Sequence, residues 1–524
     1  MRRAKSTRRA LTAVGTLILL ALPLAACSGN SGTSSEGGSA SANPGSPVRG
    51  GSITIAQVGD PESLDPTQTY ANQSILIMKN IYEMLYDSTP NGQGFIPWLA
   101  TGYSLSANKL AWTFHLRHGV KFSNGQPMTS ADVMFSFERA MAKTSVWGFI
   151  DDVITSITTP DPETVVFHTK KPVASMLAIV SLYGNCILPA NFAGETAAKF
   201  FQKPIGTGPF EVTSWVHGQS LTAKRNPYYW QSGKPYLDSV TWTVVSSDTT
   251  RLLELRGGQV QIDEFPAWSQ LSQIKSMPGD ALAEEPSTEV EMLLFNEHVK
   301  PFQDIHVREA INLALNRKAL VEAALFGNGS PIGTFLAPNI PLSSPEPVPP
   351  FDLAKAKADM AASTVPHGFS TTLNISSGSA LESAVGQIVQ QELAPLGIKV
   401  KIQPLDPSTW FGDTTALKYQ MATVYVNTDI ADSSELVEAA SGTGGNWVGW
   451  SDAQLTAVGN RAGAVFSPAE RKSLYAQYLR TYDAHYPIAA LFLSPWVYAL
   501  SSSVHGFHIL LTGNYRLADV WIAK

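Results

Sequence analysis

Residues 110–140 constrain the fold of this chain more than any other stretch. Apolar and polar side chains alternate along 112–116, which is the period of a strand with one buried face. Asn124-Gly125 can adopt positive φ and turn the chain. Thr129 stands three residues before Asp132, a spacing typical of a helix N-cap, and apolar residues then recur at helical spacing. The segment therefore predicts a strand, a turn and a helix of an α/β fold.

The chain has 524 residues, which is too long for one hydrophobic core, so we expect two or three lobes. Hydrophobic residues make up 44% of it, enough to form those cores. The net charge is -6, and no basic tract follows the first residues, so nothing indicates a nucleic-acid partner. The 10 histidines are scattered through the sequence and predict no metal site and no cofactor.

The N-terminus has the pattern of an export signal. Basic residues in 2–9 precede an apolar run, 10–26, that is too short for a comfortable membrane span. The run ends in Leu-Ala-Ala before Cys27 and resembles the lipobox of bacterial lipoproteins, which implies cleavage of residues 1–26 and lipidation of Cys27. A plain secretory signal is the alternative. With Cys27 lipidated, Cys186 has no disulfide partner and is expected to be buried.

Residues 28–50 consist mostly of Gly, Ser and other small or polar residues. Such a segment has almost nothing to bury, so we expect a disordered tether. A tether of this length spans about 25–30 Å root-mean-square. Together with the lipid anchor, it predicts a folded body that works close to the outer face of the bacterial cell membrane.

Several motifs support one family resemblance. WTFHLRHGVKFSNGQ and DVMFSFER, both within 110–140, resemble the signature of the bacterial extracellular solute-binding proteins of family 5, the peptide and nickel class of ABC importers. PESLDP at 61–66, PIGTGPF at 204–210 and RNPYYW at 225–230 match further landmarks. In residues 301–317 the family's Pro-Phe-x-Asp-x-x-Val-Arg-x-Ala-Ile-x-x-Ala-x-x-Arg is met at every position. The resemblance covers nearly all of the mature chain, in order.

The resemblance implies a periplasmic-binding-protein-like α/β fold of the cluster C type. Two α/β lobes are expected, joined by hinge crossovers near Phe265 and Pro487, with an accessory β-rich subdomain inserted in the first lobe. The expected ranges are 27–50 for the lipidated cysteine and tether, 51–87, 204–265 and 488–524 for the first lobe, 88–203 for the accessory subdomain, and 266–487 for the second lobe. Two crossovers make a hinge, and a ligand is expected in the cleft that the hinge closes.

The resemblance also implies a binding site. In the peptide binders a strand ends in Gly-Trp-x-x-Asp-x-x-Asp/Glu-Pro, whose first Asp pairs with the ammonium group of the ligand; here the corresponding run is YVNTDIADSS. Asp429 aligns with the first acid and Asp432 with the second. A carboxylate in a water-poor cleft suits an ammonium partner. The alternatives are a solvated loop acid for Asp429 and a helix N-cap for Asp432. Tyr425 and Asn427, on the same run, are further candidates.

Two departures from that motif bear on the ligand. Val426 replaces its Trp and Ser433 replaces its Pro. Thr423 lies where some oligopeptide binders have a basic residue for the peptide carboxylate. These changes weaken the prediction of a peptide ligand and leave the transport role intact.

Four more residues are candidates for ligand contact. Trp410 lies where the family packs a Trp on the ligand, and its flat face suits a peptide plane, an aliphatic side chain or a sugar ring. Asn446 and Trp447 follow a glycine-rich loop that would let the backbone approach a ligand. Tyr70 could contribute from the first lobe. Ordinary core packing is the alternative for each aromatic residue.

The predicted function is that of a monomeric, lipid-anchored binding protein. It would deliver an oligopeptide or dipeptide to ABC permease subunits that work with a cytoplasmic ATPase. The alternative ligands are an oligosaccharide, a metal chelate or an opine-like solute. A surface enzyme or sensor is less favoured, because no Gly-x-Ser-x-Gly or His-Glu-x-x-His motif is present.

Overall fold

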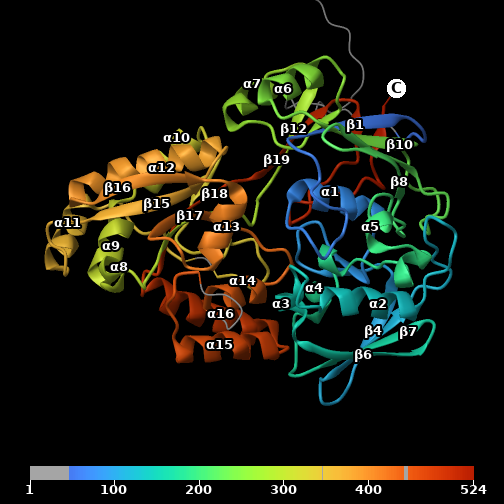
Figure 1. Ribbon diagram of the computed structural model, residues 1–524, viewed down its shortest axis with the longest axis horizontal. Coiled ribbons are helices and arrows are strands. Elements are labelled where there is room, and N and C mark those ends of the chain that lie inside the picture. The colour runs from blue at the N-terminus through green and yellow to red at the C-terminus, as the bar shows by residue number, and fades with distance from the viewer. Residues whose placement is uncertain (1–45, 345, 442–446, 524) are drawn as a thin grey trace, which may run out of the picture. The chain divides into compact units, whose positions relative to one another are not determined.

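The computed structural model describes residues 46–344, 346–441 and 447–523 (Figure 1). Cys27 and most of the predicted tether lie outside these residues. Among the helices of the described residues, none combines the length and the apolar character needed to span a membrane.

The first sheet has seven strands in the order β12-β19-β11-β1-β10-β9-β8. Their bounds are β12 Asp280–Glu285, β19 Trp496–Ser501, β11 Ile262–Asp263, β1 Ser52–Gln57, β10 Ser239–Val244, β9 Ser220–Arg225 and β8 Phe210–Val216. β1 pairs in parallel with β10 and β11, and the other pairs are antiparallel. The helices of this part are α1 Asn72–Ile81, α4 Met176–Ile179, α5 Ala197–Phe200, α6 Asp248–Arg256 and α7 Leu271–Lys275.

Two glycines bring the chain before β8 against the end of α1. A Cβ added to Gly206 would lie 2.0 Å from the carbonyl oxygen of Ile81, and one added to Gly208 would lie 2.6 Å from it. The amide of Gly208 also donates to that oxygen at 3.0 Å. Only glycine permits this approach, as expected from the PIGTGPF motif.

The third sheet has four antiparallel strands in the order β4-β5-β7-β6 and falls within the predicted accessory range. Its strands are β4 Ala100–Leu105, β5 Ala111–Leu116, β7 Thr164–Thr169 and β6 Ile154–Asp161, with helices α2 Ser130–Ala140 and α3 Gly148–Asp151 nearby. Thr129 and Asp132 form the predicted capping box of α2, in which the Thr129 amide donates to Asp132 Oδ2 at 2.7 Å. Two small hairpins complete this half of the fold, β2 Tyr86–Ser88 with β3 Phe95–Pro97 and β20 Val504–His505 with β21 Trp521–Ile522.

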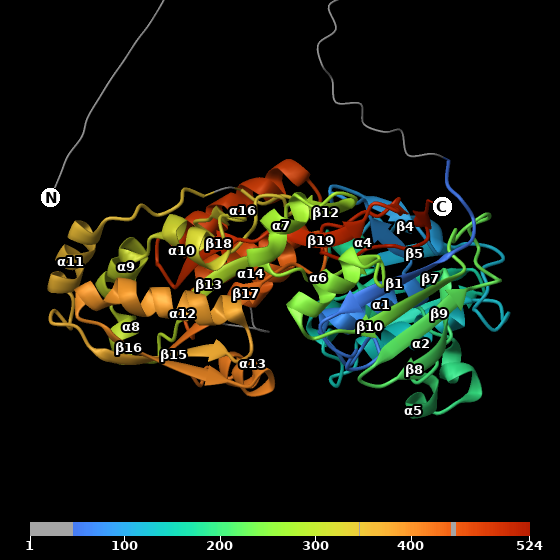
Figure 2. The ribbon, with the colours of Figure 1, turned by 90° about the horizontal axis from the view of Figure 1, so that it is seen from above.

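The second sheet has six strands in the order β14-β18-β13-β17-β15-β16. Their bounds are β14 Ser330–Pro331, β18 Ile488–Leu493, β13 Val290–Phe295, β17 Met421–Val426, β15 Ser370–Ser376 and β16 Lys399–Leu405. Its helices are α8 Lys300–Gln303, α9 Ile305–Ala314, α10 Arg317–Ala324, α11 Leu353–Ala362, α12 Ala380–Leu393, α13 Pro407–Thr415, α14 Ser434–Ser441, α15 Ala453–Ala464 and α16 Pro468–Asp483. β15 pairs in parallel with both β16 and β17, and α12 lies along β15 and β16 (Figures 1 and 2). Strand alternation at 369–375 and 398–403 and helical spacing at 381–393 predict this β-α-β unit, and the structure confirms it.

The chain passes between the first and second sheets twice. The first passage joins β12 to β13 through residues 286–289, and the second joins β18 to β19 through residues 494–495. The two segments lie together, since the Ser287 hydroxyl donates to the carbonyl oxygen of Ser494. Both changes of sheet fall later in the chain than the crossovers expected near Phe265 and Pro487. The division into lobes with those exact ranges stays a prediction.

Candidate ligand-binding site

Asp429 lies in the loop that follows β17 and contacts a residue far away in the sequence. Its Oδ1 accepts a hydrogen bond of 2.5 Å from the hydroxyl of Tyr183, which is 246 positions earlier and belongs to the half of the fold that holds the first and third sheets. Tyr183 itself is buried. The predicted anchor residue therefore lies where the second sheet's loops meet the other half of the molecule.

A second acid, Glu435, supports the loop that carries Asp429. Its Oε2 accepts from the backbone amides of Asp429 at 2.8 Å and Ile430 at 3.1 Å, and from the Thr428 hydroxyl at 2.8 Å. Burial raises the pKa of both Asp429 and Glu435, and the charge of Asp429 raises the pKa of Glu435 further. Among the described residues neither acid forms an ion pair. The loop thus holds two neighbouring carboxyl groups without a cation to balance them.

A chain of aromatic rings leads away from Asp429, beginning at Tyr183. Tyr70 meets Trp147 edge to face, with ring centroids 4.6 Å apart, and Trp147 meets Tyr183 in the same way at 5.0 Å. On the other side Tyr70 lies 5.7 Å from Phe411 of α13. Burial, followed by the charge of Asp429, raises the pKa of Tyr70 to about 12. We call Tyr70, Trp147, Tyr183, Phe411, Asp429 and Glu435 the junction site.

The two predicted tryptophans pack in the core of the second sheet instead. Trp410 is half-buried, and its Nε1 donates to the carbonyl oxygen of Thr423 at 3.2 Å. Trp447 packs edge to face on Phe335 at 5.6 Å, and its carbonyl oxygen accepts from a tyrosine hydroxyl. The next residue after Trp410, Phe411, is 48% exposed and is the ring that reaches Tyr70. These contacts favour core packing for both tryptophans, and their contact with ligand stays a prediction.

The remaining candidates are placed differently. Tyr425 lies near the end of β17 and is 45% exposed. Asn427 is half-buried in the loop before Asp429. Asn446 lies outside the described residues. Cys186 is buried, as predicted, and burial raises the pKa of its thiol to about 12.

Asp432 has a structural partner. Its two carboxylate oxygens accept from the guanidinium of Arg471 at 2.9 and 2.7 Å, and Oδ1 also accepts from the amide of Ser434, the first residue of α14, at 2.9 Å. Both members of the ion pair are buried. The geometry supports the alternative of a residue that stabilises the start of the helix, and it adds an ion pair that the sequence pattern did not reveal.

Tyr183, Trp147, Phe411 and Glu435 are the members of the junction site that sequence reasoning missed. Tyr183 and Trp147 belong to segments whose position against the second sheet is fixed only by tertiary packing. The signal that could have found Phe411 is its place beside Trp410 on a helix, because adjacent helical residues point to different sides. Glu435 stands three residues after Asp432, a spacing that indicates a helix cap and not a ligand contact.

A cavity of 150 Å³ lies next to the junction site. Ile430, Ser434 and Glu435 line it on one side, and residues of the other half, among them Phe149 and Ser175, line it on the opposite side. The loop that carries Asp429 thus borders open space, and that space is small compared with a bound peptide.

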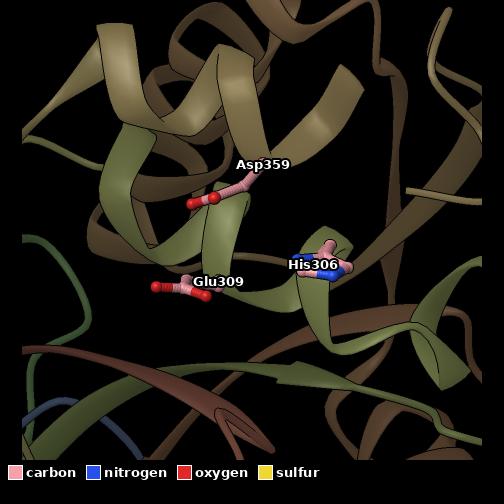
Figure 3. Close-up of side chains that lie close together, drawn as sticks. All are labelled: His306, Glu309 and Asp359. Carbon is pink, nitrogen blue, oxygen red and sulfur yellow. The ribbon is translucent and has the colours of Figure 1, made fainter. Parts of the chain in front are cut away.

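A separate trio of possible metal ligands lies on the surface of the second half. His306 and Glu309 of α9 and Asp359 of α11 have ligand atoms within 4.8 Å of one another (Figure 3). Lys355 already neutralises both acids, with Nζ 2.5 Å from Glu309 Oε1 and 2.9 Å from Asp359 Oδ2. The trio is therefore explained by a surface ion-pair network.

Comparisons with known proteins identify the class. Residues 94–447 match the model of bacterial extracellular solute-binding proteins, family 5 Middle. The glutathione-binding protein GsiB of Salmonella choleraesuis (strain SC-B67) is 30% identical over 370 residues, covering 68% of this chain and 69% of that protein.

Two solved structures share the whole fold. One is the ABC transporter-associated periplasmic binding protein DppA from Helicobacter pylori in complex with the peptide STSA, with a TM-score of 0.81, 26% identity and coverage of 91% of this chain and 99% of that one. The other is the binding protein AgaA from A. tumefaciens R10 in complex with agropinic acid, with a TM-score of 0.81, 26% identity and coverage of 90% of this chain and 99% of that one. The chain therefore belongs to the bacterial extracellular solute-binding proteins of family 5, which are substrate-binding proteins of ABC importers and not enzymes.

Proposed function

We propose that this protein captures a peptide through its free amino terminus and delivers it to the permease of an ABC importer. The observation that carries the proposal is the pair of half-buried Asp429 and buried Glu435, which has no cation among the described residues. A buried carboxylate is costly without a counter-charge, and a ligand ammonium would supply one. The hydrogen bond between Tyr183 and Asp429 supports this position as the place where the two halves close on a ligand.

The named relatives support a small organic ligand, but the chemistry of their ligands differs. One solved relative holds the peptide STSA, another holds agropinic acid, and the curated relative is named for glutathione. An opine-like solute, an oligosaccharide or a metal chelate is therefore the alternative ligand class for the same transport role.

The membrane attachment is part of the proposal. Lipidation of Cys27 and the tether up to residue 50 would hold the folded body at the outer face of the cell membrane, beside the permease subunits and their cytoplasmic ATPase. The basic, apolar and small-residue pattern before Cys27 supports this anchoring.

The test is calorimetry with a series of tripeptides Ala-X-Ala, each with a free or an acetylated amino terminus. Removing one member of a buried ion pair costs about 3–5 kcal/mol, and 1.4 kcal/mol is about tenfold in affinity. For any peptide that binds, we expect acetylation or Asp429→Asn to weaken binding by roughly two to three orders of magnitude. Glu322→Gln, an exposed acid on α10, is the matched control for loss of one negative charge. Equal binding of free and acetylated peptides would contradict the amine anchor.

A further inference from the structure

Three more acidic side chains gather at the end of the second sheet beside Asp429. Glu291 is the second residue of β13 and lies opposite Tyr425 of β17 in the sheet register. Glu382 is in the first turn of α12, and Glu289 immediately precedes β13. Cross-strand partners point to the same face of a sheet, so Glu291 and Tyr425 lie on the face that α12 covers.

Glu291 is buried without a hydrogen-bond or ion-pair partner among the residues that the structure describes. Glu291 is 3% exposed, and its Oε1 accepts no hydrogen bond from the described residues. Burial raises the pKa of its carboxyl well above the ordinary value, and the charges of Glu382 and Glu289 raise it further. An unsatisfied buried polar atom costs about 1–3 kcal/mol of stability, and a ligand that donates a hydrogen bond to this carboxyl would offset that cost.

The other two acids have only neutral partners. The Thr423 hydroxyl donates to Glu382 Oε2, and the Ser494 hydroxyl donates to Glu289 Oε1 at 2.9 Å. None of the ion pairs found in the described part of the chain includes Glu289, Glu291 or Glu382. The three carboxyls thus form an acidic cluster that no cation in the described part of the chain balances.

The acid trio is connected to the junction site through Tyr425. Burial raises the pKa of the Tyr425 hydroxyl, and the charges of Glu289, Glu291, Glu382 and Asp429 raise it further, so this hydroxyl lies within electrostatic reach of all four acids. Tyr425 is nevertheless 45% exposed, so the cross-strand neighbour of Glu291 is open to a ligand group.

The topology places the same acids where α/β sheets bind ligands. β15 lies between β16 and β17, and the chain leaves β15 toward α12 and β16, whereas β17 follows on the opposite side. Open α/β sheets bind ligands at the carboxyl ends of their strands, at such a switch point. Glu382 follows β15 and Asp429 follows β17, so both acids come from that end of the sheet.

We propose that Glu291, with Glu382 and Glu289, forms a second cation site that receives the side-chain ammonium or guanidinium group of a lysine or arginine in the bound peptide. The proposal rests on the proposed function, because it takes the amino terminus of that peptide to lie at Asp429. It narrows the substrate class to peptides with at least two positive charges.

The arrangement suits an organic cation better than a metal ion. A metal ion needs several ligand atoms converging on one point, and in the described residues the trio that converges within 4.8 Å is the one around Lys355. An ammonium or guanidinium group has three to five N–H donors and can reach acids that are spread over a strand, a helix terminus and a crossing segment.

Calorimetry with two tripeptides of similar length tests the proposal. Ala-Lys-Ala and Ala-norleucine-Ala share the free amino terminus and differ in the side-chain ammonium. Hydrogen bonds to charged groups contribute enough for a preference of about 10- to 100-fold, and we expect the lysine peptide to bind that much more tightly. Glu291→Gln should reduce this preference to within about threefold and leave the affinity for the norleucine peptide unchanged. Glu322→Gln should keep the wild-type preference.

The outcomes separate this inference from the proposed function. If both peptides bind equally well and both lose affinity on acetylation, the second cation site is overturned and the amine anchor stands. If neither peptide binds, the peptide function is overturned, and the cation site with it. The urea midpoint gives a further distinction. Glu291→Gln removes an uncompensated buried acid, so the midpoint should stay the same or rise. A fall in the midpoint with an intact lysine preference would show a purely structural residue.

Discussion

The ion pair of Asp432 and Arg471 makes a quantitative prediction about stability. Their side chains are 6% and 7% exposed, and the two hydrogen bonds between them, of 2.9 and 2.7 Å, have the bidentate geometry of a strong pair. Asp432→Asn keeps the shape but leaves the guanidinium buried without its counter-charge, which costs about 3–5 kcal/mol. Urea unfolding should show this loss in the free energy of unfolding, while the ligand affinity measured by calorimetry stays close to that of the wild type.

The matched variant Asp429→Asn should behave in the opposite way. Asp429 has no cation partner among the described residues, and burial raises the pKa of its carboxyl, so neutralising it should leave the free energy of unfolding unchanged or increase it. Its effect should appear in ligand affinity. Loss of binding in Asp432→Asn with an unchanged urea midpoint would contradict these roles, as would easier unfolding of Asp429→Asn without loss of affinity. Replacing both Asp432 and Arg471 with apolar residues should recover most of the stability lost in the single variant.

Three further predictions follow from charge and anchoring. Burial raises the pKa of Glu83 and Asp151 to about 7 and that of Glu264 to about 8, so the folded state binds more protons than the unfolded state above the ordinary carboxyl range. Their contribution to stability is present at low pH and is lost as the pH rises through 7 to 8. The urea midpoint should therefore be higher at pH 5.5 than at pH 8.5. A lower midpoint at pH 5.5 would contradict this expectation. Burial raises the pKa of Glu382 to about 7, so a cationic peptide that needs its charged form should release protons on binding near neutral pH. The heat of binding should then differ between buffers of different ionisation enthalpy, and equal heats would argue against proton release. Cys27→Ser should move the protein from the membrane fraction to the medium, because each buried acyl CH₂ contributes about 0.8 kcal/mol to anchoring; retention in the membrane fraction would indicate another anchor.

Local patterns predicted the parts of the fold whose contacts are short in sequence. The capping box of α2 needs only the spacing of Thr129 and Asp132. The glycines before β8 indicate a close approach of two backbone segments. The β-α-β unit of β15, α12 and β16 follows from alternation and helical spacing within 36 residues of sequence, 370–405. In each case the residues that make the contact lie close enough for their pattern to be recognised.

The changes of sheet could not be located in this way. β12 joins the first sheet only because it pairs with β19, more than 200 residues later in the chain. Apolar residues continue from α1 to Tyr86, but the helix ends at Ile81, where the carbonyl accepts from the amide of Gly208 and Tyr82 is extended. Both outcomes depend on partners that the local pattern does not contain.

The sequence predicted only the part of the binding site that follows one strand, β17. The run that ends in Asp429 pointed to the correct loop, whereas Tyr183 becomes its partner only through tertiary packing. Glu291 stands in the strand VEMLLF, all of whose residues are buried, so no alternation marks it as special. Its significance comes from the unpartnered carboxyl and from Glu382 of a distant helix, which only the folded chain brings near.

Native mass spectrometry of the freshly purified mature protein tests the central claim most directly, because it reveals the ligand that the protein carries from its host. We expect a non-covalently bound peptide with a free amino terminus and at least one lysine or arginine, which Asp429→Asn loses and Glu322→Gln retains. A co-purified sugar, a metal chelate or an anionic solute that Asp429→Asn binds as well as the wild type would contradict the assignment of this site to a peptide cation.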